Sequence, residues 1–292
     1  MYPNKFDYYR PASLAEAVEI LARYGQEARP LAGGQSLIPL MKLRLANPAV
    51  IVDLNALPGL NYIRQDGDRL LIGALTCHSD VEESRIVGTR YDAIVDAVTH
   101  IGDAQVRNLG TVGGSLVHGD PSGDWGPVLL ALGGEVCCLG PNGNRLIEAS
   151  VFFTEMYETA RQPDEIVTEV RIASPGPKAG GAYVKLERRA GDFAIVGAAV
   201  CLALDDHGAC AGAGIALSGV ASTYVKATTA ERVLRGSRLN EATIAEAVRA
   251  LDDEMDPYSD VRAPAEYKRA MAKVFFRKAL EVARRRASAH GP

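Results

Sequence analysis

The sequence QVRNLGTVGGSLVHGDPSGD, residues Gln105–Asp124, contains five glycines in twenty residues. It lies between a helical pattern that ends near His100 and a strongly apolar segment from Trp125 to Leu132. Its apolar residues follow neither helix nor strand periodicity, so the stretch predicts a long loop inside a compact domain. A loop of this length is uncommon unless it has something to hold.

The centre of this stretch has the composition of a backbone anion site. It consists of Thr111, Val112, Gly113, Gly114 and Ser115. Paired glycines let the main chain approach a ligand closely and turn its N–H groups inward, and the flanking hydroxyls add donors. This predicts a cradle for an anion.

A similar segment occurs about eighty residues upstream. It consists of Leu31, Ala32, Gly33, Gly34, Gln35, Ser36 and Leu37. The two segments share a small residue, a glycine pair, a serine and a leucine. Two such cradles can face the two phosphates of one diphosphate, so we expect the segments to hold a diphosphate between them.

Other interpretations of these features stay open. The glycine pairs at Gly133 and Gly180 look like a helix end and a domain entry, so a pair alone is weak evidence. Asp124 could simply cap a helix, and Lys185 could lie on a solvated strand edge, although it could also contact a phosphate or an electron-rich ring. No G-x-G-x-x-G motif follows a predicted strand, and a Walker loop is absent.

Composition limits the class of protein. The chain has 292 residues, 47% of them hydrophobic, which supports a large core and at least two units. Its formal charge is −4 with scattered basic residues, which argues against nucleic acid as a partner. The five cysteines show no metal-ligand or disulfide spacing, so we expect no metal site. No apolar run reaches the length of a membrane span and no signal core is present, so we expect a cytoplasmic protein.

Helix and strand patterns predict an α+β fold in two domains. The segment Ser174–Pro177 contains two prolines and a glycine, which resist both helix and strand, and marks the boundary between residues 1–176 and 177–288. The first domain mixes helices and strands, including a hairpin across Asp66-Gly67 and helix starts at Ser13 and Ser79. The second reads as three strands, 182–188, 194–204 and 210–217, followed by three helices, 229–235, 241–252 and 264–286.

With these residues in view, the chain resembles the FAD-binding medium subunits of molybdenum hydroxylases. This family includes the medium chains of aerobic carbon monoxide dehydrogenase and the FAD subunits of xanthine dehydrogenase. The resemblance covers nearly the whole chain and is carried by four segments in the family's order. They are PLAGGQSLIPLMKLRLANPAVIVDL (30–54), the opening stretch (105–124), PDEIVTEV (163–170) and KLERRAGDFAIVGAA (185–199).

The resemblance implies a vanillyl-alcohol-oxidase (PCMH) type FAD-binding domain followed by a small domain of three strands and helices. It implies that the two glycine segments hold the diphosphate from either side and that Asp124 accepts hydrogen bonds from the adenosine end. Ile101 and Ile166 would line the cofactor cleft, and Lys185 would approach the flavin. Two residues depart from the family: Gln35 replaces a frequent histidine, and Phe193 replaces a tyrosine that covers the flavin. Phe193 can still stack on the ring, but it lacks the hydroxyl.

The resemblance further implies an oxidoreductase subunit with no catalytic residue beyond the flavin. FAD would receive electrons from the [2Fe–2S] clusters of a small subunit, and a large subunit would carry the molybdopterin cofactor, in a dimer of heterotrimers. The electron acceptor would be external: NAD, quinone or oxygen. The alternatives are a self-contained FAD-dependent oxidoreductase and a non-catalytic nucleotide-binding assembly subunit.

Two expectations for variants follow from this hypothesis. Valine at Gly33 or Gly113 should abolish FAD retention by filling the space that the phosphates need, with the fold largely intact. Alanine at Lys185 should alter flavin reduction while FAD stays bound.

Overall fold

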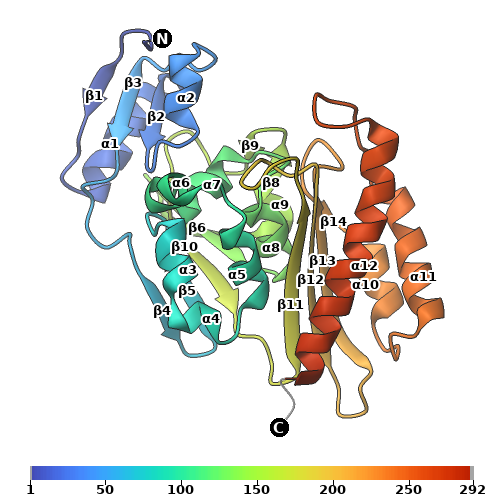
Figure 1. Cartoon of the computed structure of the whole chain (residues 1–292). Helices are drawn as coiled ribbons and strands as arrows, with labels where there is room; N and C mark the ends of the chain where they lie inside the picture. Colours follow the sequence, from blue (N-terminus) through green and yellow to red (C-terminus); the bar gives the residue numbers. More distant parts are fainter. Residues whose placement is uncertain (1, 290–292) are drawn as a thin grey trace.

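The computed structural model describes residues 2–289, and its first unit is built on a small parallel sheet with strand order β1-β3-β2 (Figure 1). Its elements are β1 (Asp7–Tyr9), α1 (Leu14–Tyr24), a 3-10 turn (Gly25–Glu27), β2 (Ala28–Leu31), α2 (Leu37–Lys42) and β3 (Val50–Asp53). Helix α1 begins as predicted, because the Ser13 hydroxyl accepts from the Glu16 N–H at 3.2 Å while the Glu16 carboxylate accepts from the Ala12 N–H at 2.7 Å. Strand β2 therefore delivers the first glycine segment to the start of α2.

The second unit packs helices on an antiparallel sheet of order β4-β5-β10-β6-β7. Its elements are β4 (Ile63–Asp66), β5 (Arg69–Gly73), α3 (His78–Glu83), α4 (Arg85–Gly88), α5 (Asp92–Thr99), α6 (Ala104–Leu109), α7 (Val112–His118), α8 (Trp125–Ala131), β6 (Glu135–Gly140), β7 (Gly143–Glu148), α9 (Ala149–Phe152), β8 (Phe153–Glu155), β9 (Glu158–Thr159) and β10 (Ile166–Ala173). The hairpin across Asp66-Gly67 is confirmed. Buried Ile72 and Val170 on the sheet belong to one core with Ile94 and Leu129 on the helices.

Two local predictions in this unit are wrong. The stretch predicted as a long loop contains two short helices, α6 and α7, separated by Gly110 and Thr111. Asp103 and Thr111 cap these helices by accepting from backbone N–H groups, which explains how glycine-rich sequence stays helical here. The helix predicted to start at Ser79 instead follows Cys77, whose N–H donates to the Asp80 carboxylate at 3.3 Å.

The third unit contains the predicted three long strands and three helices. Its elements are β11 (Ala179–Leu186), β12 (Val196–Leu204), β13 (Cys210–Ser218), β14 (Val225–Lys226), α10 (Thr228–Leu234), α11 (Glu241–Ala250), a 3-10 turn (Leu251–Asp253) and α12 (Ala265–Ala289). The strands form an antiparallel sheet in chain order, and the two-residue β14 extends it beyond the prediction. The predicted α+β class is confirmed.

The third sheet is covered on both sides. Figure 1 shows α12 along one face and α5 and α8 of the second unit on the other. The approach of α8 is close, since a Cβ built on Gly214 in β13 would lie 1.8 Å from the carbonyl oxygen of Ala131. Arg286, near the end of α12, makes a two-pronged pair with the Asp96 carboxylate in α5, at 2.6 and 3.0 Å. Strand β11 is thus an edge strand of this sheet, yet α12 and α5 both pack against it.

None of the helices within residues 2–289 is long and apolar enough to cross a membrane.

Candidate functional site

The two glycine segments lie against each other, although about eighty residues separate them. A Cβ built on Gly33 would lie 2.0 Å from the carbonyl oxygen of Leu109 and 2.8 Å from the Cα of Gly110. One built on Gly114 would lie 3.8 Å from the Cβ of Ala32. Only a glycine at position 33 allows this approach, so the first segment docks directly on the residues that precede the second.

The first segment presents a row of unused donors. The main-chain N–H groups of residues 32–36 make no hydrogen bond to any part of the chain that the structure describes. Two carbonyl groups at the start of this loop are occupied: Ala32 O accepts from the Asn55 amide at 2.9 Å, and Gly33 O accepts from the Gln35 amide at 3.1 Å. Gly34 has a φ of +71°, a conformation that suits glycine and helps to turn successive N–H groups toward one side. Such a loop can bind an anion.

The second segment differs from its predicted role. All four N–H groups of residues 112–115 donate within the protein, so the expectation of a second free backbone cradle is wrong in this respect. The acceptors are Thr76 O for Val112 at 3.0 Å, Ala74 O for Gly113 at 2.9 Å, Thr111 Oγ1 for Gly114 at 3.1 Å and Thr111 O for Ser115 at 2.9 Å. What this segment can still offer a ligand is the hydroxyl groups of Ser115 and Thr111.

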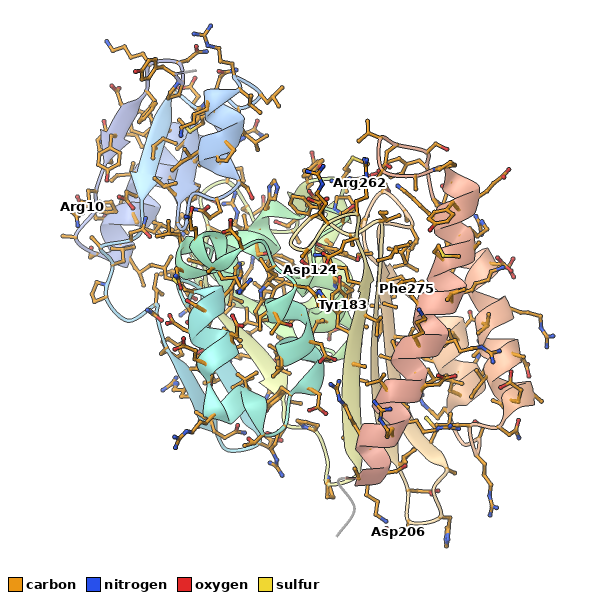
Figure 2. The ribbon with its side chains drawn as sticks, viewed as in Figure 1. Arg10, Asp124, Tyr183, Asp206, Arg262 and Phe275 are labelled. Carbon is orange, nitrogen blue, oxygen red and sulfur yellow. The ribbon has the colours of Figure 1, made fainter. Side chains whose placement is uncertain are left out.

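Asp124 and Lys185 form a buried ion pair between the second and third units. The Asp124 carboxylate accepts from the Tyr183 hydroxyl at 2.7 Å and from Lys185 Nζ at 3.2 Å. Asp124 stands at the predicted N-cap position of α8, but its side chain makes no capping bond there. Lys185 has only 1% of its side chain exposed, which also excludes a solvated strand edge. Figure 2 shows Asp124, just before α8, beside Tyr183 of β11.

Lys185 holds more than one partner. Its Nζ donates to the carbonyl of His100 at 3.0 Å and lies 3.3 Å from a carboxylate oxygen of Glu187. One lysine therefore compensates two buried or half-buried carboxylates, Asp124 and Glu187. Because His100 precedes Ile101, this network also fixes the turn that carries Ile101.

Ile166 and Phe193 lie apart from this pair. Ile166 is 2% exposed and belongs to the core around Leu54 and Leu60 at the junction of the first two units. Phe193 is 44% exposed, and the guanidinium carbon of Arg262 lies 5.7 Å from its ring centroid. The structure thus brings together the two glycine segments, and separately Asp124 with Lys185.

Comparison with known proteins identifies the family. Residues 4–175 match the FAD binding domain in molybdopterin dehydrogenase, and residues 181–283 match the CO dehydrogenase flavoprotein C-terminal domain. The chain belongs to the FAD-binding medium subunits of molybdenum hydroxylases. It is an oxidoreductase subunit, and the predicted family and FAD-domain fold are confirmed.

Relatives of this medium subunit match it over almost their full length. The carbon monoxide dehydrogenase medium chain of Afipia carboxidovorans is 41% identical over 98% of this chain and 99% of its own. A carbon monoxide dehydrogenase structure from Hydrogenophaga pseudoflava superimposes with a TM-score of 0.96 at 38% identity, covering 98% of this chain and 99% of that one. Quinoline 2-oxidoreductase from Pseudomonas putida 86 gives a TM-score of 0.91 at 31% identity, covering 98% and 99%.

Burial controls the ionisation of Asp124. Loss of solvent raises the pKa of this carboxyl group from 3.8 to about 6, and the charge of Lys185 and the Tyr183 hydrogen bond oppose the rise. Because the pKa in the folded medium subunit lies above the unfolded value, the stability that this group contributes is complete below about pH 3.8. It is lost as the pH rises through 6.

The variant Asp124→Asn tests this titration. Between pH 4 and pH 7, the free energy of unfolding of the wild type should fall relative to that of the variant by up to about 3 kcal/mol. Urea unfolding at pH 4, 5, 6 and 7 measures the difference. The exposed Asp206 provides a control, since Asp206→Asn should track the wild type. Parallel pH curves for wild type and Asp124→Asn would contradict the assignment.

Arg107 is a residue that the sequence argument missed. It lies in the opening stretch, where an arginine among glycines was the available signal. Its Nε donates to Glu82 at 2.9 Å, and its Nη1 donates to the carbonyls of Ile101 and Gly102 at 3.1 and 3.4 Å. Gly191, in the loop that carries Phe193, packs on Gly102. Arg107 therefore supports both the Ile101 turn and the loop beside it.

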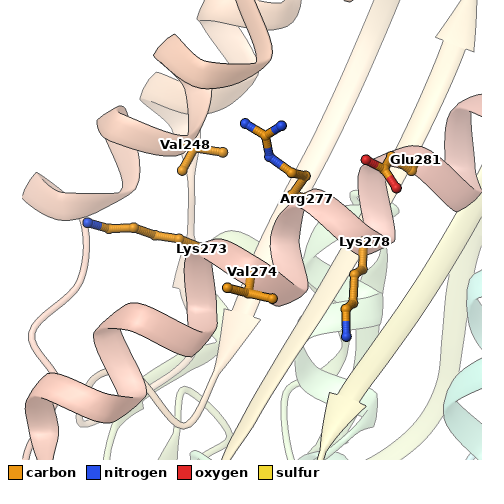
Figure 3. A pocket seen from close by; sticks show the side chains of 6 residues that line it. All are labelled: Val248, Lys273, Val274, Arg277, Lys278 and Glu281. Carbon is orange, nitrogen blue, oxygen red and sulfur yellow. The ribbon is translucent and has the colours of Figure 1, made fainter. Parts of the chain in front are cut away.

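A surface pocket of about 300 Å³ lies away from these residues, between α11 and α12 (Figure 3). It is lined by Val248, Lys273, Val274, Arg277, Lys278 and Glu281. Lys273 pairs with Asp252, and Arg277 pairs with Glu241. These two cations are therefore already paired with carboxylates.

Proposed function

We propose that this medium subunit holds one FAD and passes electrons from the [2Fe–2S] clusters of a partner subunit to an external acceptor. The observation that carries the proposal is the row of unused N–H groups at residues 32–36, which lies against the second glycine segment. A diphosphate needs several donors in a confined space, and this loop supplies them without a lysine or arginine of its own. The residues present therefore fit an FAD diphosphate.

We assign the remaining roles as follows. The first segment binds the diphosphate, and Thr111 and Ser115 add hydroxyl groups to it. Asp124 and Lys185 are bonded to each other, so they meet the FAD at one place, and we assign the pair to the flavin side, which Lys185 approaches from the third unit. Ile101 and Ile166 line the cleft, and Phe193 covers the ring. In this proposal residues 1–176 form the FAD-binding domain and residues 177–288 the second domain.

The flavin supplies the redox chemistry when bound, and the chain supplies position and electrostatic surroundings. Arg107 and Lys185 hold the Ile101 turn from two sides, which fixes one wall of the cleft. Gln35 stands where the family often has histidine, and its amide donates to Gly33 O, so it holds the loop in shape. We infer that Gln35 and Phe193 adjust the flavin potential and the choice of acceptor without weakening FAD binding.

We further propose that the medium subunit works in a cytoplasmic dimer of heterotrimers with a small iron–sulfur subunit and a large molybdenum subunit. Relatives with the same fold carry names for different substrates, carbon monoxide and quinoline. A conserved FAD unit combined with different substrates fits a complex in which the large subunit selects the substrate.

Purification of the complex tests the function. We expect a yellow protein with a flavin spectrum, about one FAD per medium subunit, and co-purifying iron–sulfur and molybdenum subunits. Flavin without these subunits would favour a self-contained oxidoreductase. Protein that takes up no flavin, alone or in the complex, would overturn the proposal.

A further inference from the structure

His78 has a ring nitrogen that the fold leaves unused. It is the first residue of α3 and is 3% exposed. Its ring packs against Gly110, which precedes the second glycine segment. The indole N–H of Trp125 donates to Nδ1 of His78 at 3.1 Å. Because an indole nitrogen can only donate, Nδ1 must be the acceptor and carry no proton.

This contact fixes the tautomer of His78. Burial and the charge of Arg107 lower the pKa of His78 to about 4, so the ring is neutral at physiological pH. A neutral imidazole without a proton on Nδ1 carries it on Nε2. Nε2 is therefore an obligatory donor, and it has no acceptor among residues 2–289.

In space, only Gly110 separates the imidazole ring of His78 from the first glycine segment. The His78 N–H donates to the carbonyl of Gly110 at 3.0 Å, and a Cβ built on Gly110 would lie 3.1 Å from Nε2. The Cα of Gly110 is in turn 2.8 Å from the Cβ position of Gly33. Gly110 is thus packed between the imidazole and the loop of unused N–H groups.

We propose that His78 is a further cofactor-binding residue, whose Nε2–H donates to an oxygen of the bound diphosphate where the two glycine segments meet. Nε2 is not sealed from solvent, so an oxygen-rich ligand can reach it and supply the acceptor that the chain does not provide. The donor is neutral, so it would orient the bound diphosphate without adding positive charge to the site. This inference rests on the FAD-binding function proposed above.

Two substitutions test the roles of the two ring nitrogens separately. His78→Asn keeps an oxygen near the Nδ1 position for Trp125 and removes the donor at Nε2. His78→Gln keeps a donor near the Nε2 position and removes the acceptor for Trp125. We expect the Asn variant to weaken FAD binding about tenfold, and the Gln variant to lose thermal stability while binding FAD nearly as the wild type does.

The measurement is titration of the deflavinated complex with FAD, followed by flavin fluorescence, with a thermal melt of each apoprotein. If the wild type binds FAD and His78→Asn binds it equally well, the His78 inference is wrong and the FAD function stands. If the wild type binds no FAD, the proposed function itself fails.

A second measurement needs no variant. When the histidines are labelled with ¹⁵N, the spectrum of the chain contains the Nδ1 and Nε2 signals of only five imidazole rings. The His78 signal should report a proton on Nε2 in the apoprotein, and the Nε2 shift should move when FAD is added. A proton on Nδ1, or an Nε2 shift that FAD leaves unchanged, would overturn the inference.

Discussion

Gly33→Ala should lower the affinity of the medium subunit for FAD by at least about a hundredfold, because one added methyl group separates the two glycine segments. The new Cβ would lie 2.0 Å from the carbonyl oxygen of Leu109, and a main-chain atom cannot move aside by rotating a side chain. The loop of residues 32–36 must shift instead, and its unused N–H groups lose their position beside the second glycine segment. Losing two donors to an anion, at about 1.5–3 kcal/mol each, gives a change of this size.

Flavin content per purified chain and the Kd of the deflavinated complex measure the effect of Gly33→Ala. Gly176→Ala is the matched control, since no atom lies within 4 Å of its Cβ position and its φ is not in the left-handed region. The control should keep wild-type flavin content. Wild-type affinity in Gly33→Ala would mean that the contact with Leu109 does not position the loop.

The reason for this effect differs from the one that the sequence suggested. The sequence predicted that a side chain at Gly33 or Gly113 would occupy the space of the phosphates and leave the fold intact. In the structure, the Cβ position of Gly33 points at Leu109 and that of Gly113 at Ala74, 2.6 Å from its Cβ. Both glycines are required by packing of the chain on itself, so substitution there should also cost stability, about 1–3 kcal/mol for an overpacked site.

Much of the fold was predictable because it depends on neighbours in sequence. The Ser13–Glu16 cap, the Asp66-Gly67 hairpin and the three long strands of the third unit are all set by residues within one element or one turn. The likeness of the two glycine segments predicted that they hold one diphosphate, and the structure places the two segments against each other. The helices α6 and α7 escaped prediction because Asp103 and Thr111, rather than apolar periodicity, stabilise their first turns.

The use of each donor in the site could not be predicted. Whether the N–H groups of residues 112–115 are free depends on Ala74 and Thr76, which only the tertiary fold brings near. Lys185 alternates with Glu187 on a strand, a pattern typical of a solvated face. The strand is instead covered by α5, and Asp124 arrives from α8 to pair with the lysine.

Because Lys185 is buried in an ion pair, its loss should strongly destabilise the medium subunit. Lys185→Met keeps the length of the side chain but leaves Asp124 and Glu187 close together without a cation. Removing one partner of a buried pair costs about 3–5 kcal/mol, and we expect a fall of this size in the free energy of unfolding at pH 7. The fall should be smaller at pH 5, where Asp124 takes up a proton that relieves the repulsion.

A double variant separates repulsion from lost packing. If uncompensated charge is the cause, Lys185→Met combined with Asp124→Asn should recover at least half of the stability that Lys185→Met alone loses, because the remaining carboxylate then faces a neutral amide. Lys178→Met is the control, since Lys178 pairs with the exposed Asp206 and should change stability by less than about 1 kcal/mol. Stopped-flow reduction by the partner subunits adds a functional measurement, and we expect a slower rate in Lys185→Met chains that still hold FAD. A single variant as stable as the wild type, together with an unchanged reduction rate, would show that the lysine neither balances Asp124 nor acts near the flavin.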